Sequence, residues 1–277
     1  MAVLTISRQE GSLGDEIAKA VSDTLSYSLI DKHKIHDMSS GFKGDYSSEM
    51  DVITNESKPG FFDFIFHQRS VYGHMLASMV YDAAGKDKCV IVGRGGQFLL
   101  HGKTHVINAR IVAPFDLRVE RVMTRMNLEK KIASDYVRTS DQKREEFINY
   151  LYREKVGDLS WYDLVIDSDR FPMDRVVAFL VDELRRLEKQ YPLTPEDIHT
   201  YQIQSLEKRI EIVLMKEMKD SNYVKVSANY DGLVVLSGYL STEAENKAVL
   251  KHVRNVDGVT AVENKIIVSQ FPVRPWY

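Results

Sequence analysis

The first 25 residues of the chain constrain its fold more strongly than any other stretch. Residues 3–7 are predicted to form a short buried strand, and a loop containing Gly11 and Gly14 follows it. The next apolar positions recur every four residues, as one face of a helix requires: Ile17, Val21 and Leu25. A strand, a glycine-containing loop and a helix in this order are the opening of an α/β nucleotide fold.

The pattern of strand and helix continues along the chain. Further strands are predicted at residues 28–30, 89–93, 105–113 and 162–167, and helical stretches lie between them. Of these, residues 89–93 are a continuous apolar run, the pattern of a strand buried on both faces. This alternation predicts a parallel sheet that helices cover on both sides. Residues 39–60 are polar and predict a mobile surface segment, either an ordinary loop or a substrate lid. A helix is expected over residues 61–84.

The pattern changes near residue 190. Residues 191–197 contain two prolines and predict a linker. After them we expect a small α+β unit: an amphipathic helix, a hairpin over residues 222–240, a helix over 242–253 and a strand over 262–268. The predicted organisation is a first domain at 1–190, a linker at 191–197, a second domain at 198–270 and a tail at 271–277.

Composition excludes several classes of protein. The formal charge of -3 gives no general attraction to nucleic acid, so no nucleic-acid partner is expected. Cys89 is the only cysteine, which rules out an intrachain disulfide and a zinc site built from paired cysteines. We expect no transmembrane segment, because no stretch approaches roughly 20 apolar residues. With no leader pattern at its start, the chain is expected to be cytoplasmic.

The glycine-containing loop departs from the phosphate-binding pattern G-x-x-x-x-G-K-[ST]. Alignment of RQEGSLGD on that pattern places Gly14 at the lysine and Asp15 at the Ser/Thr position. Asp15, Glu16 and Glu10 would repel a triphosphate unless magnesium or arginines intervene. One hypothesis is that Asp15 itself contacts magnesium. A tight turn that binds no ligand is the alternative.

Five blocks of sequence occur together in a specific order. They are TISRQEGSLGDEIAKAVSDTLSYSLIDK, CVIVGRGGQFLL, IVAPFDLRVERVMTR, SDQKREEFINYLY and YDLVIDS. Over about residues 1–190 this series resembles the cytidylate kinase-like family, a divergent branch of the nucleoside monophosphate kinases. The resemblance implies a P-loop kinase fold with a five-stranded parallel sheet and a nucleotide site at the carboxyl ends of the strands.

The resemblance also implies roles for individual residues. Arg94 would hold the acceptor phosphate, Arg144 would fold over the transferring group, and Asp31 and Asp141 match acceptor-side and lid positions. The loop would contribute cofactor-binding residues: Arg8, Gly11, Ser12, Gly14 and Asp15. The chain departs from the family pattern at Leu13, where a glycine is usual, and at Asp15, where arginine is usual. Gly95 stands where cytidylate kinases proper have aspartate.

Arginine suits these roles because its planar fork binds phosphate bidentately. The spacing of Arg118, Arg121 and Arg125 places all three on one helix face. They are either phosphate ligands, Arg118 foremost, or a solvated basic face. Arg144 is either a ligand or part of a salt-bridged surface helix. No residue is assigned to a metal, since His33 and His36 form an isolated pair of the kind usually found at surfaces.

The second unit resembles a BON domain over roughly residues 198–270. The matching features are Gly232 in the hairpin turn, Gly238 after Leu-Ser, and Gly258 in VDGVTAVENKIIV. The resemblance implies binding of a protein or a lipid-like partner, without catalysis. The tail, FPVRPWY, either contacts a partner or packs back on the domain.

Two functions follow as expectations. The first is ATP-dependent, Mg²⁺-assisted phosphorylation of a nucleoside monophosphate such as CMP. The second is a catalytically inactive nucleotide sensor or scaffold that acts through its BON domain. The residues that separate them are Leu13, Gly14 and Asp15: an arginine in place of the missing lysine favours the enzyme, and an open acidic pocket favours the alternative.

Overall fold

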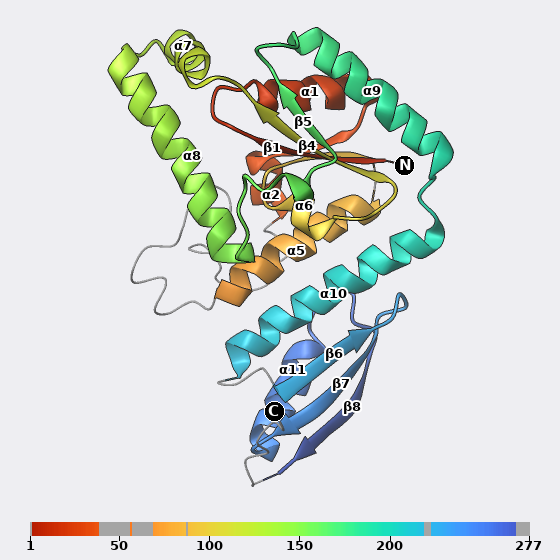
Figure 1. Cartoon of the computed structure of the whole chain (residues 1–277). Helices are drawn as coiled ribbons and strands as arrows, with labels where there is room; N and C mark the ends of the chain where they lie inside the picture. The colour runs from red at the N-terminus through yellow and green to blue at the C-terminus, as the bar shows by residue number, and fades with distance from the viewer. Residues whose placement is uncertain (1, 39–55, 57–68, 87, 219–222, 270–277) are drawn as a thin grey trace.

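The computed structural model describes residues 2–38, 56, 69–86, 88–218 and 223–269. Within these residues the chain builds two β-sheets, one of five strands and one of three. Figure 1 shows the larger sheet in the N-terminal part of the chain and the smaller one in the C-terminal part, with the long helix α10 (Pro195–Glu217) between them.

The large sheet is parallel throughout, in the order β2-β3-β1-β4-β5. Its strands are β1 (Val3–Arg8), β2 (Ser28–Ile30), β3 (Cys89–Val92), β4 (Val106–Val112) and β5 (Leu164–Asp167). β1 is the middle strand of the five and pairs with β3 on one side and with β4 on the other. The prediction of a helix-covered parallel sheet is therefore confirmed.

Helices cover both faces of this sheet (Figure 1). Leu4 and Ile6 of β1 point to the face where α1 (Gly14–Leu25) and α9 (Met173–Gln190) pack. Val3 points to the opposite face, which α5 (Arg69–Lys86) covers and next to which lies the short α6 (Gly96–Leu99). Burial on both faces explains why β3 is a continuous apolar run, CVIV.

Three further helices stand at the carboxyl ends of the strands. α2 (Lys32–Met38) follows β2, and α7 (Phe115–Met126) follows β4. α8 (Lys130–Tyr152) then crosses the end of the sheet before the short 3₁₀ helix η2 (Leu159–Trp161) leads into β5. The apolar faces of α7 and α8 pack on each other through Val119, Val122, Ala133 and Val137.

The small unit has an α+β architecture, as expected. β6 (Val224–Ala228) and β7 (Leu233–Leu240) form an antiparallel hairpin, and β8 (Ala261–Val268) adds to β7 in parallel. α10 and α11 (Glu243–Val253) share one apolar core with this sheet. Gly232 has a φ of 82° in the hairpin turn, where a Cβ would come within 2.2 Å of the Gly258 carbonyl oxygen.

Helix α10 belongs to two cores. Tyr201 and Ile212 pack into the core around α5, whereas Ile210 and Leu214 pack into the core of the small sheet. The helix begins inside the predicted linker, with Thr194 and Asp197 forming a capping box at its start. The placement of a domain boundary at residues 191–197 stays a prediction.

Three sequence expectations fall largely or wholly outside the described residues, and the tail at 271–277 is one of them. Of the predicted mobile segment at 39–60, the structure describes a single residue, Glu56. Of the helix predicted at 61–84, it describes the part that begins at Arg69, and this helix ends at Lys86. Among the helices that the structure describes, none combines the length and apolar character needed to cross a bilayer.

Candidate phosphate-binding site

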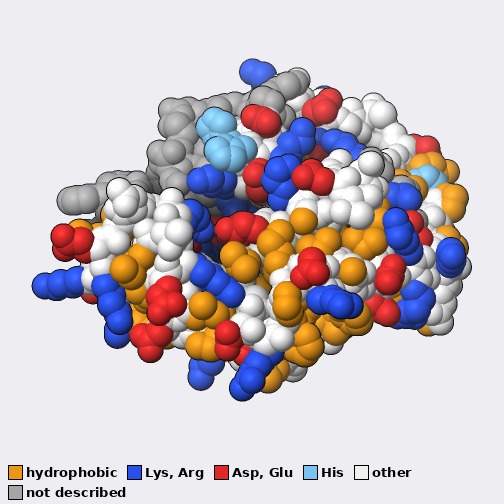
Figure 2. Space-filling view, turned by 90° about the horizontal axis from the view of Figure 1, so that it is seen from above, with side chains coloured by type: hydrophobic (Ala, Val, Ile, Leu, Met, Phe, Trp, Pro, Cys, Tyr) orange, Lys and Arg blue, Asp and Glu red, His pale blue; other side chains and the backbone are white. Residues whose placement is uncertain are grey.

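A cavity of about 460 Å³ lies at the carboxyl ends of β1 and β3. In open α/β sheets ligands bind at this edge of the sheet. Figure 2 views the molecule from above and shows a hollow in which basic and acidic side chains face each other. The charged side chains that line the cavity are Arg8, Arg94, Arg125, Arg144, Lys32, Lys143, Glu10, Asp15, Asp31 and Glu56.

Arg8 ends β1 and sends its side chain across the start of α1. A Cβ atom at Gly14 would lie 2.4 Å from the Cβ of Arg8, closer than two carbon atoms can approach. A side chain at position 14 and the observed Arg8 side chain therefore exclude each other. The Arg8 guanidinium reaches the cavity, where Nε donates to Asp15 at 3.1 Å and Nη1 donates to Glu56 at 2.8 Å.

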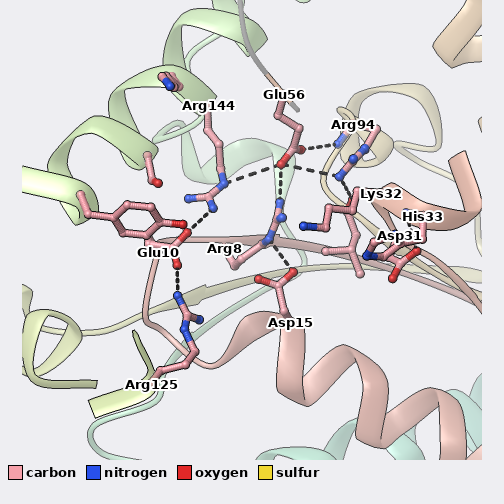
Figure 3. A pocket seen from close by; sticks show the side chains of 14 residues that line it. Arg8, Glu10, Asp15, Asp31, Lys32, His33, Glu56, Arg94, Arg125 and Arg144 are labelled. Atoms are coloured by element: carbon pink, nitrogen blue, oxygen red, sulfur yellow. Dashed lines mark hydrogen bonds and ion pairs between the residues drawn. The ribbon is translucent and has the colours of Figure 1, made fainter. Parts of the chain in front are cut away.

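Glu56 is the centre of the charge cluster in Figure 3. Its side chain is buried and pairs with three guanidiniums, those of Arg8, Arg94 and Arg144. Burial alone would raise the pKa of Glu56, but the positive charges of Arg8, Arg94 and Arg144 lower it well below its usual range. Although burial alone would lower the pKa of Arg8, Glu56 and Asp15 raise it above its ordinary value.

Glu10 forms a second bridge between helices (Figure 3). It accepts from Arg125 of α7 at 2.5 Å and from Arg144 of α8 at 2.6 Å. Burial opposes ionisation of Glu10, yet the hydrogen bonds from Arg125 and Arg144 outweigh it and lower the pKa of the carboxyl. Glu10 thus holds both arginines beside the loop as charged groups.

The loop rests on Arg118 and Asp141. Arg118 is 5% exposed and donates to the carbonyl oxygens of Ala113 and Glu10 and to Asp141. Asp141 in turn accepts from the backbone N–H of Glu10 at 2.8 Å. A Cβ at Gly11 would come within 2.6 Å of the Arg118 carbonyl oxygen, so only glycine lets the loop lie this close to α7.

A strained turn presents Arg94. Gly93, Arg94 and Gly95 have φ values of 71°, 58° and 70°, so three successive residues are left-handed. This conformation costs a non-glycine residue about 1–3 kcal/mol, and such strain clusters at binding sites. Tyr152 of α8 fixes the turn, since its hydroxyl donates to the Arg94 carbonyl oxygen at 2.8 Å. Burial lowers the pKa of Arg94, although Glu56 opposes the shift.

A second cavity of about 400 Å³ lies on the other side of Arg125, which lines both cavities. Gly11 and Leu13 of the loop line it together with Leu117 and Arg121 of α7. Arg121 is held by Ser168, which follows β5, through its hydroxyl and its carbonyl oxygen. This cavity is open and partly apolar.

The structure brings together five of the predicted site residues as cavity lining: Arg8, Asp15, Asp31, Arg94 and Arg144. Asp31 also accepts from the backbone N–H groups of His33 and Lys34 in the first turn of α2. Arg118 and Asp141 lie under the loop, Gly11 faces the second cavity, and Ser12 donates to the Gln9 carbonyl oxygen within the loop. Gly14 provides room for Arg8.

Sequence reasoning missed Glu56 as a site residue. It treated Glu10 only as a carboxylate that would repel a triphosphate, and it left Arg125 open between a phosphate ligand and part of a solvated basic face. The signal for Arg125 was available, because its spacing from Arg118 and Arg121 places all three on the helix face that contacts the loop. Glu56 gave no periodic signal. Among the described residues no group of three or more His, Cys, Asp or Glu side chains is arranged to hold a metal ion.

Six basic side chains face four acidic ones across the first cavity. The basic side chains outnumber the acidic ones by two, so positive charge is left over for an incoming anion. Guanidiniums that converge on one point at the ends of parallel strands bind phosphate well. The arrangement can therefore bind phosphate groups and neutralise their oxygens.

Comparison with known proteins agrees with this geometry. Residues 3–170 match the cytidylate kinase-like family, and residues 204–270 match the BON domain. The cytidylate kinase of Methanosarcina mazei is 24% identical over 172 residues, which cover 61% of this chain and 88% of that protein. A cytidylate kinase of Methanocaldococcus jannaschii is 29% identical over 27% of this chain and 43% of that one.

Two other similarities are of different kinds. A Corynebacterium glutamicum protein described as a uronate isomerase is 32% identical over 110 residues, but this chain spans only 21% of its length. The chain spans about half or less of the first curated relatives. An uncharacterized protein of Eubacterium ventriosum has a similar fold, with a TM-score of 0.52 at 20% identity over 67% of this chain and 99% of that one.

The family match covers more than half of the chain, and the fold and the arginine-lined cavity are consistent with it. The chain belongs to the cytidylate kinase-like family and carries a BON domain after its kinase-like part.

Proposed function

We propose that this protein transfers a phosphoryl group from ATP to a nucleoside monophosphate, CMP or a close relative, with the help of Mg²⁺. The observation that carries the proposal is the convergence of Arg8, Arg94, Arg125 and Arg144 on one cavity at the carboxyl ends of β1 and β3. Family membership supports the same reaction class. The choice of CMP rests on the relatives described as cytidylate kinases.

Phosphoryl transfer needs positioning and positive charge more than covalent help. An oxygen of the acceptor phosphate attacks the γ-phosphorus of ATP, the bond from that phosphorus to the bridging oxygen breaks, and ADP leaves. In this proposal Arg94 holds the acceptor phosphate. Arg144 and Arg125 neutralise the transferring group, and Glu10 keeps these two arginines in position. Arg118 acts through the loop that it supports.

Arg8 supplies the charge that lysine supplies in other phosphate-binding loops. Its guanidinium lies in the cavity, and its side chain passes over Gly14, the position of the missing lysine. The observed position of the Arg8 side chain requires a glycine at position 14. In this proposal the guanidinium of Arg8 therefore replaces the ammonium of the absent lysine. This supports the enzyme hypothesis over an open acidic pocket.

Mg²⁺ fits the chemistry of the site in a limited way. Magnesium in kinases is held by one or two carboxylates together with substrate phosphates and water. The Asp15 side chain is 54% exposed and lines the cavity, so it is the residue that would hold the ion. Bound there, Mg²⁺ would neutralise charge on the phosphate oxygens.

The second cavity is the place that we propose for the nucleobase of ATP. Leu13 and Leu117 give it apolar walls, and Arg125 connects it to the cavity in which phosphates would lie. Ligand sites commonly combine such apolar walls with a few polar groups.

The test is ATP consumption by the purified full-length protein with Mg²⁺ and a panel of nucleoside monophosphates. Turnover with CMP is expected, and Arg94→Ala should lower kcat/KM by about 10²–10³-fold because one charged donor to the phosphate is lost. Arg186→Ala is the matched control, since Arg186 is an exposed arginine of α9 paired with Glu183. Turnover that persists in Arg94→Ala would contradict the role of Arg94.

A nucleotide sensor or scaffold is the second candidate. The observation that favours it is that carboxylates of the chain itself already pair with Arg8, Arg125 and Arg144. Nucleotide binding without turnover, in protein shown to be folded, would establish this candidate in place of the enzyme.

The BON domain completes the proposal as a binding module for a protein or a lipid-like partner, in a cytoplasmic protein. Support comes from the family match and from the lone Cys89, which suits a reducing compartment. Leu236 is fully buried in the core of the small sheet, so Leu236→Asp should disrupt the BON domain. A partner that retains the wild-type full-length protein but not this variant would support the role.

A further inference from the structure

The carboxylate of Glu56 lies where a bound anion would receive the most donors. Its Oε2 atom is 2.8 Å from Nη1 of Arg8, 3.6 Å from Nε of Arg144 and 3.7 Å from Nη1 of Arg94. Its Oε1 atom accepts the backbone N–H of Arg94 at 3.0 Å. Figure 3 shows this side chain pointing into the guanidiniums from above.

This set of donors suits a phosphate better than a carboxylate. Three guanidiniums and a backbone N–H are the groups that proteins use to hold phosphate oxygens. A carboxylate offers two oxygens and one negative charge, whereas a phosphate monoester offers three terminal oxygens and up to two charges. Two of the three guanidinium distances to Glu56 exceed 3.5 Å, so a larger anion would make closer contacts.

The backbone around the carboxylate is shaped to admit it. A Cβ at Gly93 would lie 2.0 Å from Oε1 of Glu56 and 2.6 Å from Nη1 of Arg8. Glycine at this position therefore leaves room for an anion next to the guanidiniums. Glu56 itself has a φ of 47°, a left-handed conformation that strains a residue with a side chain. Its inward position is thus opposed by the backbone and maintained by ion pairs.

We propose that Glu56 is an internal stand-in for a phosphate monoester: its carboxylate occupies the anion position of Arg8, Arg94 and Arg144 and must be displaced when a ligand's phosphate binds. The ligand identity rests on the proposed function, but the anion position does not. In the free protein Glu56 keeps three guanidiniums paired and oriented. It also lowers the affinity of the site for phosphate, because every ligand must compete with it.

The test compares full-length wild type with Glu56→Gln and with Asp23→Asn. Glu56→Gln keeps the shape of the side chain and removes its charge. Asp23→Asn removes one negative charge from the exposed Lys19–Asp23 pair of α1, so it controls for net charge. Isothermal titration calorimetry at constant pH and ionic strength measures Kd first for inorganic phosphate and then for CMP.

We expect Glu56→Gln to bind inorganic phosphate at least tenfold more tightly than wild type, with Asp23→Asn within twofold of wild type. An unchanged or weaker affinity in Glu56→Gln overturns the proposal and makes Glu56 a residue that positions the arginines. If Glu56→Gln gains phosphate affinity while no variant binds CMP, the internal stand-in is supported and the proposed substrate is wrong. If CMP binds but Glu56→Gln leaves the phosphate affinity unchanged, the proposed substrate is supported and the internal stand-in is wrong.

Circular dichroism and a thermal melt check that each variant is folded. Should Glu56→Gln fail to fold, Glu56→Asp replaces it, because aspartate keeps the charge but is one methylene shorter. The shorter carboxylate reaches Arg8 less closely, so phosphate should bind several-fold more tightly than in wild type. No gain in that variant overturns the proposal.

Discussion

At the scale of single residues, the site is defined by what glycines permit. Gly14 makes room for the Arg8 side chain, and Gly93 makes room for the Glu56 carboxylate. In each case a charged residue from another part of the chain occupies the space that a side chain at the glycine would need: Arg8 at Gly14, and Glu56 at Gly93. The position of the missing lysine is therefore not empty, because the Arg8 side chain passes over Gly14.

Substitution of Gly14 tests this arrangement. In Gly14→Ala the new methyl group would lie 2.4 Å from Cβ of Arg8. Such overpacking is expected to destabilise the protein by about 1–3 kcal/mol. In Arg8→Gly the obstructing side chain is gone, so the double variant should be more stable than the sum of the two single effects predicts. Urea unfolding of the four proteins measures this coupling, and strictly additive effects would refute the contact.

At the scale of secondary-structure elements, α7 and α8 carry half of the basic side chains that line the first cavity: Arg125, Lys143 and Arg144. Arg118, Arg121 and Arg125 of α7 all contact the loop after β1, so this helix face packs on the loop, and a role for it in binding phosphate stays a prediction. Arg144 of α8 pairs with Glu10 and Glu56 across the cavity. On the other side of the sheet, α5 carries two glycines with different surroundings.

These two glycines give opposite predictions. No described atom would lie within 4 Å of a Cβ at Gly73, so Gly73→Ala should stabilise the protein by about 0.5–1 kcal/mol through the lower entropy of the unfolded chain. A Cβ at Gly85 would lie 2.9 Å from Cβ of Tyr201 in α10. Gly85→Ala should therefore be destabilising by about 1–3 kcal/mol. Thermal and urea unfolding measure both, and equal effects of the two changes would show that α10 does not pack at Gly85 in solution.

At the scale of the whole molecule, α10 joins the kinase-like part to the BON domain. It contributes apolar side chains to both cores, so neither core is complete without it. Polar contacts reinforce the contact with α5: Ser205 donates to the Ser78 carbonyl oxygen at 3.1 Å, and His74 lies 3.3 Å from Glu211. Burial lowers the pKa of His74 to about 4, although Glu211 opposes the shift.

The His74 shift predicts a dependence of stability on pH. Because the pKa is about 6.5 in the unfolded chain and about 4 in the folded one, the unfolded state binds more protons between these values. The contribution of His74 is thus present above pH 6.5 and is lost as the pH falls toward 4. Between pH 7 and pH 5 the loss amounts to about 2 kcal/mol.

Urea unfolding of wild type and His74→Gln at both pH values checks this. Glutamine stays neutral, so the variant should lose about 2 kcal/mol less than wild type over the same interval. Comparison of the two proteins cancels other titrating groups, among them His105, whose pKa burial also lowers. Parallel pH profiles would show that His74 is not buried against α10.

The sequence by itself determined the parallel sheet, the helices that cover it, the α+β unit and the family. These follow from local signals: apolar periods of two and 3.6 residues, glycines at turns, and an ordered series of blocks. It also predicted Arg8, Arg94 and Arg144 as site residues, through the resemblance and the chemistry of arginine, and all three line one cavity in the structure.

Only the tertiary structure decided how the charges pair. Glu56 meets Arg8 across 48 positions of sequence, and Glu10 meets Arg144 across 134. No periodic pattern links such residues, because an ion pair depends on where the folded chain brings two side chains, and Glu56 stands in a polar stretch without apolar period. The same limit applies to the missing lysine. A sequence pattern compares residues position by position, so it could not show that the side chain of Arg8, at the end of the preceding strand, lies over Gly14.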